Sequence, residues 1–110
     1  PYLIHTDHGE MVCVPYSTDV NDFNMFARGG MTLDQGQATL REQFDRLYAE
    51  GATSMRLMNF GLHPHIIGQP YRIRALEEFL AYVKQFDDVW FPTRAEIAEW
   101  YLEHHADHIG

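Results

Sequence analysis

The stretch that decides the fold is Ser54-Met55-Arg56-Leu57-Met58-Asn59-Phe60-Gly61, which runs into Leu62-His63-Pro64-His65. Its first part is short and almost continuously apolar, a pattern typical of a strand covered on both faces in a parallel sheet. In parallel α/β folds, functional groups gather in the loops that leave the C-terminal ends of strands. We therefore expect residues 62–69 to form a loop that carries a functional site.

Helical patterns lie on both sides of this stretch. Residues 37–50 carry an apolar stripe at helical spacing, and Gly51 follows as a stop signal. Residues 70–86 carry a second stripe, with Pro70 suited to the first helical position. Thr93 and Glu96 form a capping-box pattern that predicts a last helix.

Further strands are predicted near the two ends. Residues 2–6 and 11–16 are apolar runs joined by the turn signal Asp7-His8-Gly9, which indicates a hairpin. Residues 88–91 read as a brief strand, and residues 17–36 as a long, partly helical loop. The order predicts an α/β fold of about three right-handed βα units preceded by a short hairpin.

Length and composition limit what the chain can be. With 110 residues, 45% of them hydrophobic, it is expected to form one globular domain, yet a closed (β/α) barrel needs about 200 to 250 residues. We therefore expect residues 1–110 to be the C-terminal arc of a larger domain whose N-terminal part is absent. The single cysteine, Cys13, is expected to be a buried thiol on a strand.

Charge and hydropathy indicate which partners to expect. The net charge of −8 and the scattered arginines disfavour binding to nucleic acid or to anionic membranes. No apolar run approaches the roughly 20 residues of a membrane helix, and the start of the sequence has no signal-peptide pattern. We expect a cytoplasmic protein without a membrane or nucleic-acid partner.

Two predicted loops carry candidate catalytic groups. Asp22 lies in the first, within Asp19-Val20-Asn21-Asp22-Phe23, and His63 lies in the second. Because the two loops leave neighbouring strands, the side chains are expected within hydrogen-bonding distance. A carboxylate beside an imidazole favours the imidazolium and fixes its tautomer, which suits proton donation to a leaving group. Alternatively, His63 is only a loop residue, and Asp22 only caps a short helix over residues 23–28.

Other polar residues have weaker patterns. His63 with His65, and His104 with His108, have spacings seen in metal sites, but each pair lacks a third ligand, so no complete metal site is expected in this chain. Arg72 is a candidate for binding a polar substrate group. Pairing with acidic neighbours such as Glu77 is the alternative for it.

Two motifs resemble those of a known family. The segment Phe60-Gly61-Leu62-His63-Pro64-His65-Ile66-Ile67-Gly68-Gln69-Pro70-Tyr71-Arg72 resembles the late histidine motif of polysaccharide deacetylases, the NodB-homology or carbohydrate esterase family four group. Val14-Pro15-Tyr16-Ser17-Thr18-Asp19-Val20-Asn21-Asp22-Phe23 resembles their Asp-x-x-Asp-Trp motif, with Phe23 in place of tryptophan. Both are nearest to the peptidoglycan-deacetylase-like and allantoinase-like branch.

The resemblance implies a distorted (β/α)7 barrel, of which this chain supplies the C-terminal part, and hydrolysis of an amide bond. It implies that His63 is the general acid, that Asp22 orients it, and that Leu62 and Phe23 line the substrate pocket, with His65 and Arg72 as further candidates for substrate binding. The family's aspartate base and its histidines for a zinc-like divalent metal normally lie upstream. The branch also implies a possible homo-oligomer, for which Trp90, Trp100 and Tyr101 are candidate interface residues, although core positions are the alternative.

Three functions stay open from the sequence. The resemblance favours removal of an N-acetyl group from a sugar polymer such as peptidoglycan. The second candidate is hydrolysis of a small cyclic ureide or imide, as in allantoinases. The third is a noncatalytic binding or assembly module.

Overall fold

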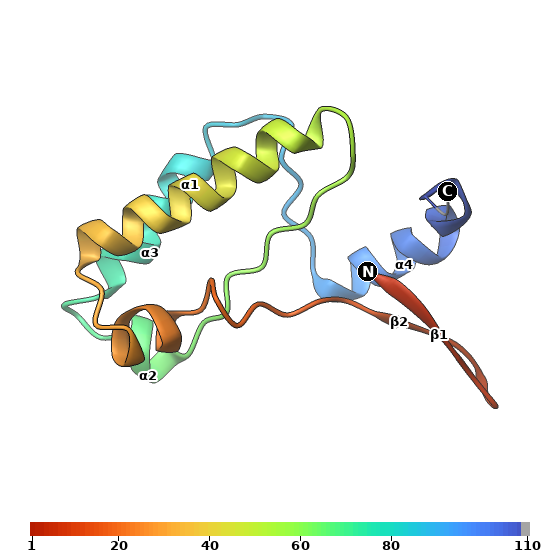
Figure 1. Cartoon of the computed structure of the whole chain (residues 1–110), viewed down its shortest axis with the longest axis horizontal. Coiled ribbons are helices and arrows are strands. Elements are labelled where there is room, and N and C mark those ends of the chain that lie inside the picture. The colour runs from red at the N-terminus through yellow and green to blue at the C-terminus, as the bar shows by residue number, and fades with distance from the viewer. Residues whose placement is uncertain (109–110) are drawn as a thin grey trace. The chain divides into compact units, whose positions relative to one another are not determined.

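The structure is a computed structural model that describes residues 1–108, without the side chain of His108; residues 109 and 110 of the predicted domain lie outside it. The described chain divides into two compact units, one made of residues 1–15 and 90–108 and the other of residues 16–89. Figure 1 labels the helices and strands.

The first unit contains the predicted hairpin. Strands β1 (Tyr2–Thr6) and β2 (Gly9–Cys13) pair antiparallel around Asp7 and His8, and Gly9 takes a positive φ of 118° at the end of this turn. Strand β2 ends at Cys13, so the prediction that it reaches Tyr16 was wrong. Cys13 is only half-buried, contrary to the prediction of a buried thiol, because a two-stranded sheet covers little of its own surface.

The same unit contains the predicted last helix. Helix α4 (Arg94–His104) opens with a complete capping box in which the Thr93 and Glu96 side chains each bond the other's backbone N–H, as predicted. A short 3₁₀ turn (His105–His108) follows it. The guanidinium of Arg94 donates hydrogen bonds to the carbonyls of Val14 and Pro15, which ties the start of α4 to the chain just after β2.

The second unit is built on two helices packed side by side (Figure 1), α1 (Leu33–Gly51) and α3 (Ile73–Val83). Their buried residues form one apolar core with the segment before residue 22 and with two short helical elements, η1 (Phe23–Arg28) and α2 (Pro64–Ile67). The core residues are Val20, Met25, Phe26, Leu40, Phe44, Ile67, Ala75, Phe79 and Val83.

Both long helices begin elsewhere than predicted. Helix α1 starts at Leu33 because Thr32 and Gln35 form a capping box that the sequence analysis missed, and it includes Gly51 instead of stopping before it. Helix α3 starts at Ile73 because residues 69–72 close a separate turn, in which the Arg72 N–H donates to the Gln69 carbonyl at 2.8 Å. Pro70 lies in that turn and not at the first helical position.

The predicted strands at residues 54–61 and 88–91 do not form as strands. A strand needs a neighbour with which to exchange backbone hydrogen bonds. Within residues 1–108, the segment before Gly61 pairs with the rest of the chain through one parallel bridge, between Asn21 and Gly61. This bridge nevertheless joins the two loops that carry the candidate catalytic residues.

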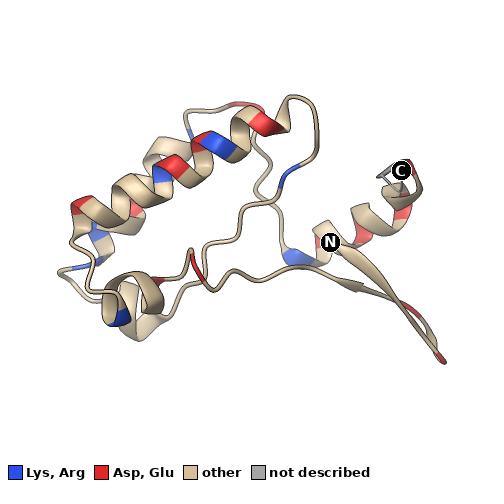
Figure 2. Ribbon diagram, viewed as in Figure 1, with Lys and Arg blue, Asp and Glu red and all other residues tan. Residues whose placement is uncertain are grey.

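No helix in the described part of the chain is both long and apolar enough to cross a bilayer. The single lysine and the arginines are spread over separate elements and interleaved with acidic residues (Figure 2).

Candidate functional site

The site is centred on Asp22, which follows the bridge directly. The Asp22 N–H donates to the Gly61 carbonyl at 2.9 Å, and the Gly61 N–H donates to the Val20 carbonyl at 3.0 Å. These two bonds bring residue 22 beside residue 63, although they are far apart in the sequence. The Asp22 side chain is fully buried, with 0% of its surface exposed.

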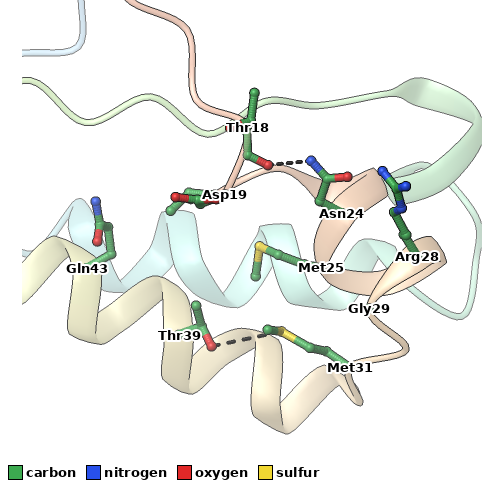
Figure 3. Close-up of a pocket in the computed structure, with 10 residues that line it drawn as sticks. Thr18, Asp19, Asn24, Met25, Arg28, Gly29, Met31, Thr39 and Gln43 are labelled. Carbon is green, nitrogen blue, oxygen red and sulfur yellow. Dashed lines mark hydrogen bonds between the residues drawn. The ribbon is translucent and has the colours of Figure 1, made fainter.

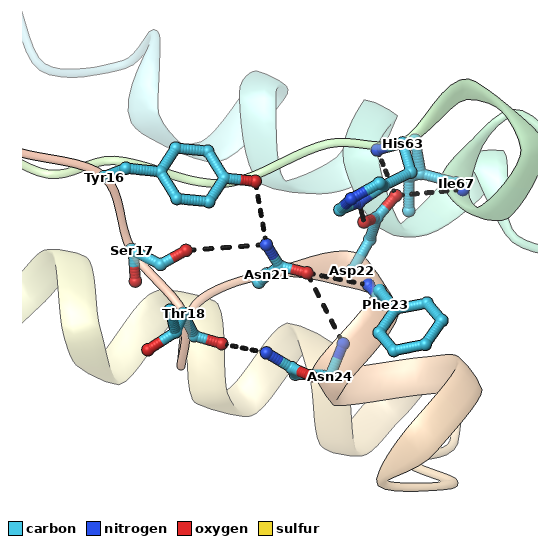
Figure 4. Close-up of polar contacts among 9 residues, drawn as sticks. All are labelled: Tyr16, Ser17, Thr18, Asn21, Asp22, Phe23, Asn24, His63 and Ile67. Atoms are coloured by element: carbon cyan, nitrogen blue, oxygen red, sulfur yellow. Dashed lines mark hydrogen bonds and ion pairs between the residues drawn. The ribbon is translucent and has the colours of Figure 1, made fainter.

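Both oxygens of the Asp22 carboxylate contact the segment of residues 63–67 (Figure 4). Oδ1 lies 2.6 Å from Nδ1 of the His63 ring. Oδ2 accepts hydrogen bonds from the backbone N–H of His63 at 2.7 Å and of Ile67 at 3.2 Å. The expected contact between the two residues is therefore present. The alternative, that the Asp22 carboxylate caps the helix after it, does not hold, because Asp22 makes no side-chain capping bond to η1.

The position of His63 is set by the proline after it. Pro64 occupies the first turn of α2, and a proline disfavours helical backbone angles in the residue before it. His63 is accordingly extended, with φ −119° and ψ 117°, at the N-terminal boundary of α2. Its side chain is 37% exposed, so the ring is anchored on the buried carboxylate at Nδ1 while part of it remains accessible.

An ionised carboxylate can only accept a hydrogen bond, so the contact with Asp22 places a proton on Nδ1 of His63. The other ring nitrogen, Nε2, is then the atom that can exchange a proton with a bound molecule. A neighbouring anion also stabilises the imidazolium form. The arrangement can therefore hold a proton at Nε2 and release it to a leaving group.

The candidate substrate-binding residues differ in how they contact the Asp22–His63 pair. The Phe23 ring is 6.1 Å from the His63 ring, centroid to centroid, and the His65 ring is 5.9 Å from it. Phe23 and Leu62 are 42% and 43% exposed, as residues that contact a ligand would be. The Arg72 guanidinium instead lies over the Tyr71 ring at 4.8 Å.

Residues that the sequence analysis missed support the pair. Asn21 is 4% exposed, and its side-chain amide bonds to the Tyr16 hydroxyl on one side and to the backbone of η1 on the other (Figure 4). Gly61 lies against them: a Cβ there would be 2.5 Å from Asn21 Nδ2 and 2.6 Å from the Tyr16 hydroxyl. The signal available in the sequence was an asparagine placed just before a short helix.

The other candidate metal ligands do not gather. His5 pairs with Glu10 at 3.4 Å in the hairpin, and the His104 ring stacks on Trp100 at 4.5 Å. The side chain of His108 lies outside the described residues. Among residues 1–107, no three side chains of His, Cys, Asp or Glu are grouped so that they could hold a metal ion.

An open groove of about 660 Å³ lies between the segment before Asn21, helix η1 and helix α1 (Figure 3). Met25 and Met31 contribute apolar surface to it, and Arg28 and Asp19 lie at its polar parts. Neither Asp22 nor His63 lines this groove, so it is separate from the candidate site.

Comparisons with known proteins agree with the motifs. No protein-family model matches the chain. A Schizosaccharomyces pombe protein named "Putative polysaccharide deacetylase" is 34% identical over 101 residues, which are 89% of this chain. The chain spans about a third of that relative's length, 32%.

Two solved structures are similar in fold and sequence. A probable polysaccharide deacetylase from Pseudomonas aeruginosa PAO1 matches with a TM-score of 0.85 and 37% identity, over 94% of this chain and 36% of that one. An allantoinase, PuuE, matches with a TM-score of 0.76 and 38% identity, over 86% of this chain and 31% of that one. The resemblance to the polysaccharide deacetylase family is thereby confirmed, and the fold is of the α/β class seen in these two proteins.

Proposed function

We propose that the chain carries the proton-donor half of the active site of a hydrolase that cleaves a carbon–nitrogen amide bond. In this proposal His63 is the general acid and Asp22 orients it. The observation that carries the proposal is the 2.6 Å contact between Asp22 Oδ1 and His63 Nδ1, made by a fully buried carboxylate to a partly exposed ring.

The chemistry follows from the two ring nitrogens. As water adds to the amide carbonyl and the carbon–nitrogen bond breaks, the departing nitrogen takes the proton from His63 Nε2. Asp22 stabilises the imidazolium before this transfer and keeps the ring in one orientation throughout. Both oxygens of the Asp22 carboxylate already bind His63 and Ile67, so the residue that activates the water is a different one. The described residues do not form a group that fits a metal ion.

The substrate class is proposed from the relatives. Two of them are named as polysaccharide deacetylases, which favours an N-acetyl sugar polymer; Phe23 and Leu62 would then form part of the wall around the acetyl group. A cyclic ureide is the second candidate, because the allantoinase is as similar in sequence, at 38% identity, as the P. aeruginosa protein at 37%. In either case we place the chain as the C-terminal arc of a distorted (β/α)7 barrel.

The test is His63→Ala in the complete reading frame that contains this chain, assayed on N-acetylglucosamine oligomers and on allantoin. We expect kcat on the true substrate to fall by about 10² to 10⁴, the usual effect of losing a positioned proton donor. The control is His8→Ala, which removes an exposed histidine in the hairpin turn.

The two substrates separate the two hydrolase activities. Unchanged turnover in His63→Ala would remove His63 from the mechanism. A wild-type protein that binds one of the compounds and hydrolyses neither would instead support a noncatalytic module.

A further inference from the structure

Asn21 is a buried polar residue that the proposed mechanism does not use. Its side-chain amide is fully satisfied: Nδ2 donates to the Tyr16 hydroxyl at 2.9 Å and to the Ser17 carbonyl at 3.4 Å. Oδ1 accepts from the backbone N–H of Phe23 at 3.1 Å and of Asn24 at 3.5 Å. These bonds use both donors of the amide and both lone pairs of its oxygen.

The bonds from Phe23 and Asn24 are those that a helix cap normally makes. The first N–H groups of a helix have no partner within the helix, and the residue just before it usually supplies a side-chain oxygen. Asp22 itself has helical backbone angles, with φ −61° and ψ −36°, so it belongs to the first turn, and its carboxylate makes no capping bond. Asn21 is the residue before this turn, and its side-chain oxygen accepts both bonds.

We propose that Asn21 is a positioning residue for the Asp22–His63 pair, because its amide caps the helical turn that contains Asp22 and so fixes the direction of the Asp22 carboxylate toward His63 and Ile67. Gly61 is part of the arrangement, since a side chain there would occupy the space of the Asn21 amide. The inference rests on the proposed function only for its catalytic meaning; the geometry that it describes can be tested alone.

The test uses NMR on the complete reading frame that contains this chain. In the wild type, the side-chain NH₂ of Asn21 and the backbone N–H of Phe23 should be protected from hydrogen exchange. The His63 and Ile67 backbone N–H groups, which donate to Asp22, should be protected as well, and ring nitrogen shifts should show His63 protonated at Nδ1. A freely exchanging Asn21 NH₂ in the wild type would overturn the proposal without any variant.

In Asn21→Ala, the N–H groups of Phe23 and Asn24 lose their side-chain acceptor, and the turn that contains Asp22 is no longer fixed. We expect exchange at the His63 and Ile67 N–H groups to speed up by at least about tenfold, and the Nδ1-protonated signal of His63 to be lost or averaged. The matched control is Asn24→Ala, which removes an amide from the same short helix that bonds to the Thr18 carbonyl and not to the N–H groups of η1. If Asn21→Ala and Asn24→Ala have equal effects on these signals, the role of Asn21 is structural only.

Asn21→Ser provides the rescue. A serine hydroxyl retains an acceptor for the N–H groups of η1 but loses the donor to Tyr16, so we expect the His63 signals to stay close to those of the wild type. A folded Asn21→Ser protein without them would show that capping is not what holds the pair. These readouts require no turnover, so they can fail while His63 proves catalytic, or hold while it does not.

Discussion

The carboxylate of Asp22 has a structural task as well as an orienting one. It contacts the His63 ring and accepts hydrogen bonds from the backbone N–H groups of His63 and of Ile67 in α2. Since the carboxylate is fully buried, water cannot replace any of these partners. Changes at residue 22 should therefore affect folding and chemistry together.

We expect Asp22→Ala to lower the free energy of unfolding by about 3 kcal/mol, because the His63 N–H loses a charged acceptor in a buried place. Asp22→Asn should lose less stability but should still impair turnover, since an amide cannot stabilise the imidazolium. Urea denaturation measures the first effect and kcat measures the second. Asp19→Asn, which changes an exposed carboxylate in the same loop, is the control. Equal stability of the Asp22→Ala and wild-type proteins would contradict the observed hydrogen bonds.

Gly61 should tolerate no side chain. A Cβ at residue 61 would lie 2.5 Å from Asn21 Nδ2 and 2.6 Å from the Tyr16 hydroxyl, which is closer than real atoms approach. We expect Gly61→Ala to cost about 1 to 3 kcal/mol in unfolding free energy. Gly51→Ala is the matched control, since a Cβ there meets nothing within 4 Å. Similar melting temperatures for the two variants would argue against the close packing at residue 61.

At the scale of elements, the second unit depends on aromatic packing between its two long helices. Phe44 of α1 contacts four aromatic rings, of which the Phe86 ring is nearest, with its centroid 4.9 Å away. The others belong to Tyr48, Phe79 and Tyr82. Phe86 lies beyond the end of α3, so the cluster also holds the chain where it leaves that helix.

Phe44→Ala should therefore be among the most damaging changes in this unit. Removing a buried phenylalanine leaves a cavity and typically costs about 3 to 5 kcal/mol. Phe44→Leu should cost clearly less, because it keeps most of the buried volume. Chemical denaturation of both variants checks this, and equal losses would show that the cavity is not the cause.

The C-terminal end of α1 should make stability depend on pH. Hydrogen bonds from Arg56 and then Arg46 lower the pKa of Glu50 from its ordinary value of 4.5. A carboxyl whose pKa is lowered by folding contributes stability above its unfolded pKa, and this contribution is lost as the pH falls through the folded value. Glu50→Gln should therefore destabilise the protein at about pH 7, and its difference in stability from the wild type should shrink as the pH falls below 4.5. Glu42→Gln, which changes an exposed carboxylate of the same helix, is the control.

At the scale of the whole molecule, much of the α/β order was predictable and the sheet was not. The capping box at Thr93 and the apolar stripe of α1 are local signals, and both correctly indicated helices. The apolar run 54–61 indicated a strand, and this prediction was wrong, because a strand is defined by its neighbours, which a local pattern does not contain. The contact of Asp22 with His63 was predicted from their loops. Asn21 was missed because the sequence favours Asp22, the residue next to the predicted helix at 23–28, as the cap, and only the structure shows that the Asp22 carboxylate binds His63 instead.

The absence of strand pairing at residues 55–60 should be measurable by hydrogen exchange. Their backbone N–H groups make no backbone hydrogen bond in the described part of the chain, so we expect them to exchange rapidly with solvent, unlike those of α1. Hydrogen exchange read by mass spectrometry or NMR checks this. Protection that appears only at high protein concentration would indicate that a second copy pairs with this segment. Protection at every protein concentration would contradict the absence of backbone hydrogen bonds from these N–H groups.

The double attachment of His63 has a consequence for how a substrate is met. The Asp22 carboxylate binds both the backbone N–H and the ring of His63, so rotating the imidazole about its side-chain bonds would break the contact with the ring. In the proposed mechanism, the general acid is therefore oriented during folding and not at each encounter with a substrate. Selectivity then depends on the residues that line the approach of the substrate to His63.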